Sequence, residues 1–237
     1  MMIQDCKWSS RLFRNSFPKV LFFLMLIGNS AYSQSSKSTG IQFIPLYNNQ
    51  PLKLESSDEG IMITTLKFYI SQMQFLFDNK VVYTEHNSYH LIDASAPETM
   101  LLSQFSDKAI HYNAIQFQLG IDSLTNVAGA MGGDLDPTKG MYWTWQSGYI
   151  NFKLEGTSTN CPARNHEFQF HLGGYQAPFN ALQTIILKTT TKQTIKIYFD
   201  IEKYIKGLDL AKHFSVMSPN QEAVSFSKKI AESFYTE

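Results

Sequence analysis

The stretch that decides the fold is residues 61–77, IMITTLKFYISQMQFLF, which alternates like a β-strand. Two sets of its apolar residues have opposite parity: Met62, Leu66, Phe68 and Ile70 before Ser71, then Met73, Phe75 and Phe77 after Gln72. Successive side chains of a strand point to opposite faces, so a change of parity requires an extra residue. The sequence therefore predicts a long strand with a bulge or bend near Ser71 and Gln72.

Short segments with strand character continue along the chain. A turn at Asp78-Asn79 leads into residues 81–83, which predicts a hairpin. Further segments alternate or form short apolar runs: from residue 41, 89–92, 115–119, 150–154, 168–172, 185–187 and 195–199. Aromatic residues, at 14%, also favour strands. We expect an all-β domain, a β-sandwich or a barrel-like relative, of about nine strands.

One C-terminal helix is predicted. Ser218 is placed as its N-cap and Pro219 at its first position, and Phe226, Ile230 and Phe234 then repeat every four residues.

The N-terminus has the pattern of a secretory signal peptide over residues 1–33. A basic region precedes the apolar run 20–27, and Ser33 ends a small-residue cleavage motif. The run is shorter than the roughly 20 residues that a membrane anchor needs. We expect cleavage near Ser33, a polar linker over 34–40, a domain over 41–237, and a periplasmic, secreted or cell-surface location.

Composition narrows the function classes. The chain has 20 basic and 20 acidic residues, and 43% of its residues are hydrophobic, which is typical of globular proteins. A neutral chain argues against nucleic acid as a partner, because phosphate binding needs a basic face. Of the 2 cysteines, only Cys161 follows the predicted cleavage point, so no intrachain disulfide is expected.

Histidine is the first candidate metal ligand, since imidazole suits copper and zinc. No zinc-type spacing is present. His86 and His90 lie four residues apart but in a predicted turn and strand, so they do not form a helical chelating pair. His166 and His171 are five residues apart on one predicted strand, which puts them on opposite faces about 16 Å apart. Any one of the histidines is more commonly solvated or hydrogen-bonded than a ligand.

The long Gly- and Asp-rich segment 122–140 is a candidate functional loop. Asp134 and Asp136 could supply oxygen ligands to calcium, but turn formation explains them better. Cys161 has no recognisable catalytic partner, and no nucleophile elbow is present. The residues alone therefore give no positive sign of catalysis, and the resemblance described below implies a protein that is not an enzyme.

Trp143 and Trp145 directly follow that segment. If the backbone is extended there, both side chains point to one side. They are either core aromatics or an exposed platform that stacks on sugar or on a partner surface.

Several stretches, taken in order, resemble the MbnP family of exported proteins over about residues 41–237. The most specific is Gly140-Met141-Tyr142-Trp143-Thr144-Trp145-Gln146-Ser147-Gly148-Tyr149. The others are Leu66-Lys67-Phe68-Tyr69-Ile70-Ser71, Gln118-Leu119-Gly120-Ile121-Asp122-Ser123, Leu135-Asp136-Pro137, Lys153-Leu154-Glu155-Gly156 and Phe170-His171-Leu172-Gly173.

The resemblance implies a β-rich copper-binding protein that acts in copper acquisition or handling. It implies a partner di-haem enzyme of the cytochrome c peroxidase-like type, which oxidises one tryptophan to kynurenine, and a possible outer-membrane transporter. Trp143 or Trp145 is then the candidate for oxidation. His171 is the best candidate copper ligand, and His213 or His166 is a candidate second ligand.

Two other functions remain open on the residues alone. A carbohydrate- or surface-binding module would use Trp143 and Trp145 as its platform. A hydrolase would use Asp134 or Asp136, but no acid/base partner is visible for either.

Overall fold

The computed structural model describes residues 40–102, 105, 110–146, 148–190 and 194–237. The predicted signal peptide, residues 1–33, lies outside these ranges, as does the predicted linker up to residue 39.

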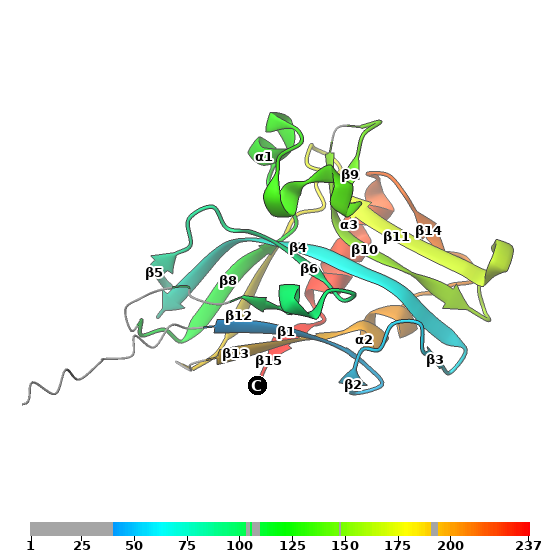
Figure 1. Ribbon diagram of the computed structural model, residues 1–237, viewed down its shortest axis with the longest axis horizontal. Helices are drawn as coiled ribbons and strands as arrows, with labels where there is room; N and C mark the ends of the chain where they lie inside the picture. The colour runs from blue at the N-terminus through cyan, green and yellow to red at the C-terminus, as the bar shows by residue number, and fades with distance from the viewer. Residues whose placement is uncertain (1–39, 103–104, 106–109, 147, 191–193) are drawn as a thin grey trace, which may run out of the picture. The chain divides into compact units, whose positions relative to one another are not determined.

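The described residues form two β-sheets (Figure 1). The smaller sheet has the strand order β15-β13-β1-β2, with β7 paired to β1. Its strands are β1 (Gly40–Tyr47), β2 (Gln50–Pro51), β7 (Leu101–Leu102), β13 (Thr194–Asp200) and β15 (Phe234–Thr236). The larger sheet has the order β12-β8-β4-β10-β11-β14, with β3, β5, β6 and β9 attached to it. Its strands are β3 (Ser57–Asp58), β4 (Ile61–Phe77), β5 (Lys80–Thr84), β6 (Tyr89–Asp93), β8 (Ala114–Leu119), β9 (Tyr142–Trp143), β10 (Gly148–Ser158), β11 (Glu167–Gly173), β12 (Gln183–Lys188) and β14 (Ser215–Val216).

Strand β4 is the centre of the larger sheet and contains the predicted bulge. Its register against β8 shifts between Ser71 and Gln74, and Gln72 has a φ of 51°. The predicted hairpin is confirmed as well, because Asp78 and Asn79 form the turn between β4 and β5. The bulge lets the apolar side chains on both sides of it, Leu66, Phe68 and Ile70 before and Met73 and Phe75 after, point to the same core. A second register shift, against β10 at Glu155 and Gly156, turns Ile63 to that core in place of Met62, which the parity had grouped with Leu66.

The main core lies between the two sheets and is built from phenylalanine. Phe68 of β4 packs edge-on against Phe43 of the smaller sheet, with ring centroids 6.0 Å apart. It also stacks on Phe152 of β10 at 6.0 Å and meets Phe199 of β13 at 6.1 Å. All four side chains are buried. The expected β-sandwich is therefore confirmed, with each sheet contributing one apolar face.

A second apolar cluster lies on the opposite face of the larger sheet, which we call the outer face. Tyr69 neighbours Phe68 in β4, so it points to the outer face. The cluster consists of Tyr69, Leu91, Ile121, Leu135, Met141, Trp143, Tyr149 and Ile150. Figure 1 shows helix α1 (Ser123–Ala128) and β9 on this side, away from β1 and β13.

The C-terminal helix exists but begins later than predicted. Helix α3 spans Gln221–Ala231, and its N-cap is Asn220, whose side chain accepts a hydrogen bond from the Ala223 N–H at 2.7 Å. The prediction of Ser218 as N-cap is therefore wrong. Serine and asparagine are about equally good N-caps, so the residue types did not distinguish the two positions. Phe234 was also wrongly placed in the helix: it lies in β15 and stacks on Phe199, with ring centroids 4.7 Å apart.

The remaining differences are short elements. The six unpredicted strands β2, β3, β7, β9, β14 and β15 have two or three residues each. The segment predicted as a loop contains α1, η2 (Gly133–Leu135) and η3 (Pro137–Lys139). The other helices are η1 (Pro97–Met100), η4 (Arg164–His166) and α2 (Ile201–Lys206). Such elements are too short for periodicity to reveal.

Candidate functional site on the outer face

The outer face carries a hydrogen-bonded pair, His171 and Glu155. In the antiparallel ladder of β10 and β11, His171 lies opposite Lys153 and Glu155 lies opposite Gln169, so the pair is diagonal. The His171 Nε2 and the Glu155 Oε1 are 2.6 Å apart. His171 is only 7% exposed. The strand pairing and the burial together fix the orientation of the imidazole.

The charge of Glu155 is stabilised by its neighbours. The hydrogen bond with His171 is the main cause that lowers the pKa of the Glu155 carboxyl from 4.5 to about 2. Partial burial opposes this shift, while a hydrogen bond from Thr65 and the nearby charge of Lys153 add to it. Glu155 is therefore an anion at neutral pH and a strong acceptor for one imidazole nitrogen.

This arrangement is the one that histidine ligands of metals typically have. A histidine that binds a metal through one nitrogen usually donates its other N–H to a carboxylate or carbonyl, which fixes the tautomer. Glu155 takes that position at Nε2 of His171. Nδ1 of His171 is then the nitrogen that could hold a metal ion.

Trp143 lies on the same face, over Gly173 of β11. It is 6% exposed and belongs to β9, which pairs with the start of β10. Its indole covers Gly173 so closely that a Cβ there would lie 2.7 Å from Cζ3 of Trp143. His171 and Gly173 are two residues apart on β11, so they share a face with a spacing of about 7 Å. The fold thus brings Trp143 close to His171.

Trp145 has a different environment. The extended backbone ends at Trp143 and residues 144–146 form a turn, so the condition for two parallel side chains is not met. Trp145 is 65% exposed, whereas Trp143 is in the second apolar cluster. The two rings still touch, with centroids 5.9 Å apart. One of the pair is therefore a core aromatic and the other an exposed one.

The other two candidate ligands lie elsewhere. His213 bonds Glu222 of α3 through Nδ1 at 2.6 Å, and α3 packs on the Phe170 side of β11, opposite His171. His166 is exposed at the end of η4, and its Nδ1 is 2.9 Å from the carbonyl oxygen of Cys161. Within the described ranges, no three His, Cys, Asp or Glu side chains are grouped closely enough to hold a metal ion.

Asp134 and Asp136 hold the loop in place. The Asp134 carboxylate accepts hydrogen bonds from the Leu91 N–H at 3.1 Å and from the Lys139 ammonium at 2.6 Å. Asp136 caps η3 by accepting from the backbone N–H and the hydroxyl of Thr138. Both are engaged as turn and anchor residues, as the sequence favoured.

The residues that sequence reasoning missed are the charged partners on the outer face. The sequence analysis used Lys153 and Glu155 only as part of a family motif. Along β10 they alternate with the inward-pointing Phe152 and Leu154, which places them on the outer face. What the sequence could not provide is the register of β10 against β11, which joins Glu155 to His171.

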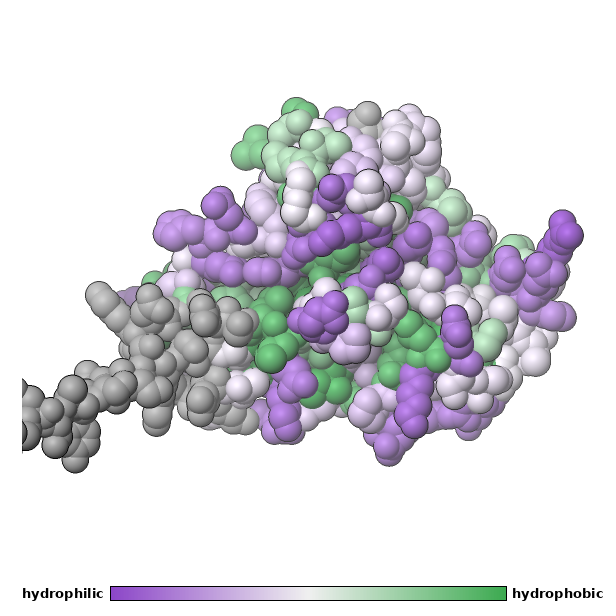
Figure 2. All heavy atoms as spheres, in the orientation of Figure 1, coloured by the Kyte–Doolittle hydropathy of each residue, from purple (hydrophilic) through white to green (hydrophobic). Residues whose placement is uncertain are grey.

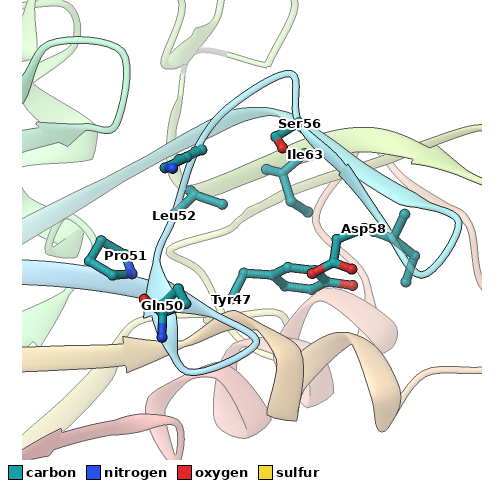
Figure 3. Close-up of a pocket in the computed structure, with 9 residues that line it drawn as sticks. Tyr47, Gln50, Pro51, Leu52, Ser56, Asp58 and Ile63 are labelled. Atoms are coloured by element: carbon teal, nitrogen blue, oxygen red, sulfur yellow. The ribbon is translucent and has the colours of Figure 1, made fainter.

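Figure 3 shows a separate pocket, of about 220 Å³, between the β1–β2 turn and β3. The ring of Tyr47 and the carboxylate of Asp58 lie together at its edge (Figure 3). None of the predicted site residues lines it. It contains no nucleophile paired with a base, so we assign no chemistry to it.

Comparison with known proteins identifies the family. A sequence model of the MbnP family matches residues 36–220. This chain belongs to the MbnP family. No curated protein sequence matches it.

Among solved structures, this MbnP-family chain is similar to MbnP from Methylosinus trichosporium. The TM-score is 0.57 at 12% sequence identity, and the match covers 79% of this chain and 86% of the other. At that identity the likeness shows a common fold. In the part of the chain that the structure describes, no helix has the length and hydropathy to span a bilayer.

Proposed function

We propose that this protein is an exported copper-binding protein that acts in copper acquisition or handling. Membership of the MbnP family supports a copper-related role. The observation that carries the proposal is the outer face, where His171 is oriented by Glu155 and Trp143 packs over Gly173, two residues along the same strand. The protein would serve as a binding protein and as the substrate of another enzyme, and not as a catalyst itself.

His171 would hold the copper through Nδ1, since imidazole suits this metal. His213 and His166 are separated from His171 by the fold, so they do not complete the same site. The second ligand would come from oxidised Trp143. Conversion to kynurenine cleaves the C2–C3 bond of the indole and adds two oxygen atoms, which two peroxides supply as they are reduced to two waters. Hydrolysis of the resulting N-formyl group then releases C2 as formate and leaves an aromatic amine and a ketone.

That conversion needs an oxidant from outside the chain. A di-haem enzyme of the cytochrome c peroxidase-like type, using peroxide, is the proposed partner. Trp143 is the preferred site of oxidation because it is the tryptophan on the His171 face. A signal peptide over residues 1–33 would place the protein in the periplasm or outside the cell, where an outer-membrane transporter is a possible further partner.

The exposed ring of Trp145 supports one alternative, a carbohydrate- or surface-binding module. Such a module could not use both tryptophans as a platform, because the Trp143 side chain is only 6% exposed. A hydrolase based on Asp134 or Asp136 has less support, since both carboxylates are engaged in fixing the loop.

The test is a Cu(I) titration of protein from its native host against a chromophoric chelator, with peptide mapping of the same material. The wild type should bind one copper and carry kynurenine at position 143. His171→Gln should lose at least about tenfold in copper affinity, whereas the exposed-histidine control His213→Gln should bind like wild type. Equal affinities for the wild type and His171→Gln, or glycan binding without copper, would contradict the proposal.

A further inference from the structure

One end of the larger sheet is built from four segments without a charged residue. No Asp, Glu, Lys or Arg occurs in residues 123–133, 140–152, 172–187 or 214–221. Charged residues make up 17% of the chain, so their absence from four separate segments sets this end apart.

These segments touch one another. The Ser123 hydroxyl donates to the carbonyl oxygen of Tyr175 at 2.7 Å, which joins the first segment to the third. Asn126 accepts from the Tyr149 N–H at 2.8 Å, which joins the first to the second. A Cβ at Gly174 would lie 3.0 Å from Cβ of Pro219, so the third and fourth are also in contact. We call this surface the uncharged end.

The uncharged end exposes large apolar side chains. Leu124 is 84% exposed and Val127 is 70% exposed, both on α1. Figure 2 shows hydrophobic side chains gathered where α1 projects. The exposed apolar residues of these segments are Leu124, Val127, Met131, Trp145, Phe179, Ile186 and Met217. Aromatic and Met side chains with few charges are typical of the core of a protein–protein interface.

Buried and partly buried hydrogen bonds beneath the surface hold it in shape. The Tyr149 hydroxyl accepts from the Met131 N–H at 3.0 Å, and the Asn126 amide donates to the Ile121 carbonyl at 2.9 Å. Tyr69 donates to the Asp134 carbonyl at 3.0 Å. A preformed surface loses little conformational entropy on docking.

We propose that the uncharged end is the docking surface for the haem-bearing oxidase, an inference that rests on the proposed function. Trp145 projects from this end and its ring touches Trp143, so an oxidant docked here reaches both tryptophans. The four segments carry no charge themselves, and Lys153 reaches only their edge, at the Gly140 carbonyl oxygen, 3.3 Å away, so a charged partner face over them would be desolvated with little counter-charge. The docking face of the oxidase is therefore itself uncharged and apolar.

Two other occupants fit less well. Nucleic acid and anionic lipid require Lys or Arg, and the four segments contain neither. A zwitterionic membrane has no such requirement, so it becomes an outcome of the test.

The test replaces the chromosomal copy in the native host with Leu124→Asp/Val127→Asp. The matched control is Val81→Asp/Val82→Asp, two residues 52% and 46% exposed on β5. Thermal unfolding of both variants checks that they fold. The readout is kynurenine in the tryptic peptide 140–153. We expect the control to be converted like the wild type and the α1 variant to be converted at least about tenfold less, a loss of about 1.4 kcal/mol in binding.

A second readout is the salt dependence of conversion. Unconverted protein is mixed with a periplasmic extract of a host that lacks the gene, and NaCl is varied. An uncharged interface predicts a rate that does not fall with salt, since there is no electrostatic steering to screen. A steep fall would overturn the proposal.

Three outcomes separate this proposal from the copper function. Equal conversion of the wild type and the α1 variant overturns the docking surface only. A wild type that binds copper but is not converted also overturns the docking surface and leaves copper binding standing. A wild type that is converted but binds no copper overturns copper binding and leaves the docking surface standing. Binding of the wild type, but not of the α1 variant, to phosphatidylcholine vesicles would make this end a membrane contact and overturn the proposal.

Discussion

Strand β11 has two faces with opposite characters. Phe168, Phe170 and Leu172 point into the core between the sheets and are fully buried. His171 and Gly173 point to the outer face, where they meet Glu155 and Trp143. The first face stabilises the fold by apolar burial. The second combines a hydrogen-bonded histidine and carboxylate, a glycine and an indole, which is an arrangement that burial alone does not explain.

The difference between the two faces indicates that the residues of the outer face were not selected for stability alone. A face that served only the fold could be filled with Val, Ile and Phe, as the inner face is. Here a buried imidazole and a carboxylate occupy positions that apolar residues could fill. Polar pairs of this kind cost desolvation, so a functional role is the simpler reason for them.

The largest expected effect is on the inner face. Phe170→Ala should lower the free energy of unfolding by about 3–5 kcal/mol, because it removes a buried aromatic and leaves a cavity. The control Phe179→Ala removes a ring that is 37% exposed and should cost much less. Urea denaturation measures both. A loss below that of the control would contradict the assignment of the core.

The next effect tests the close packing of the outer face. In Gly173→Ala the new Cβ meets both the Tyr149 carbonyl oxygen, at 2.6 Å, and the Trp143 ring. We expect a loss of about 1–3 kcal/mol and a red shift of Trp143 fluorescence in a Trp145→Phe background. Gly132→Ala is the control, since its Cβ would have no neighbour within 4 Å. Unchanged fluorescence in Gly173→Ala would mean that Trp143 does not lie over Gly173.

A smaller effect is expected at the hydrogen bond between His171 and Glu155. Glu155→Gln should lower stability at pH 7 by about 1–2 kcal/mol, because a charged hydrogen bond to His171 becomes a neutral one. The folded-state pKa of Glu155 is depressed to about 2, so its stabilisation is present above pH 4.5 and is lost as the pH falls towards 2.

The stability difference between the wild type and Glu155→Gln should therefore shrink over that pH range. Glu167→Gln, at an exposed position on the same sheet, should show little difference at any pH. A difference that stays constant from pH 7 to pH 2 would contradict the cause assigned to the lowered pKa.

The smallest effect is expected at the surface tryptophan. Trp145→Phe should change stability by less than about 0.5 kcal/mol, because the side chain is mostly exposed. Trp143→Phe removes a buried indole and should cost more. Thermal unfolding of the two variants distinguishes them, and equal losses would show that both rings are equally packed.

Much of the fold was predictable from alternation in the sequence. The parity change at Ser71 and Gln72 located the bulge, and alternation located the long strands. The helix boundary was not predictable, because Ser218 and Asn220 are both good caps and only the packing of α3 selects between them.

The candidate site was predictable only in part. His171, Trp143 and Trp145 follow from motifs, but their environments depend on a turn after Trp143 and on the register of β10 against β11. Glu155 could be placed on the outer face by parity alone, yet its contact with His171 required the pairing of strands from distant parts of the chain.

The most direct test of the central claim is an anomalous difference map, recorded at the copper edge on crystals of the protein from its native host. The account predicts a single strong peak on the outer face, beside Nδ1 of His171 and residue 143. A peak beside His213 and Glu222, or no peak in a crystal soaked with Cu(I), would contradict it.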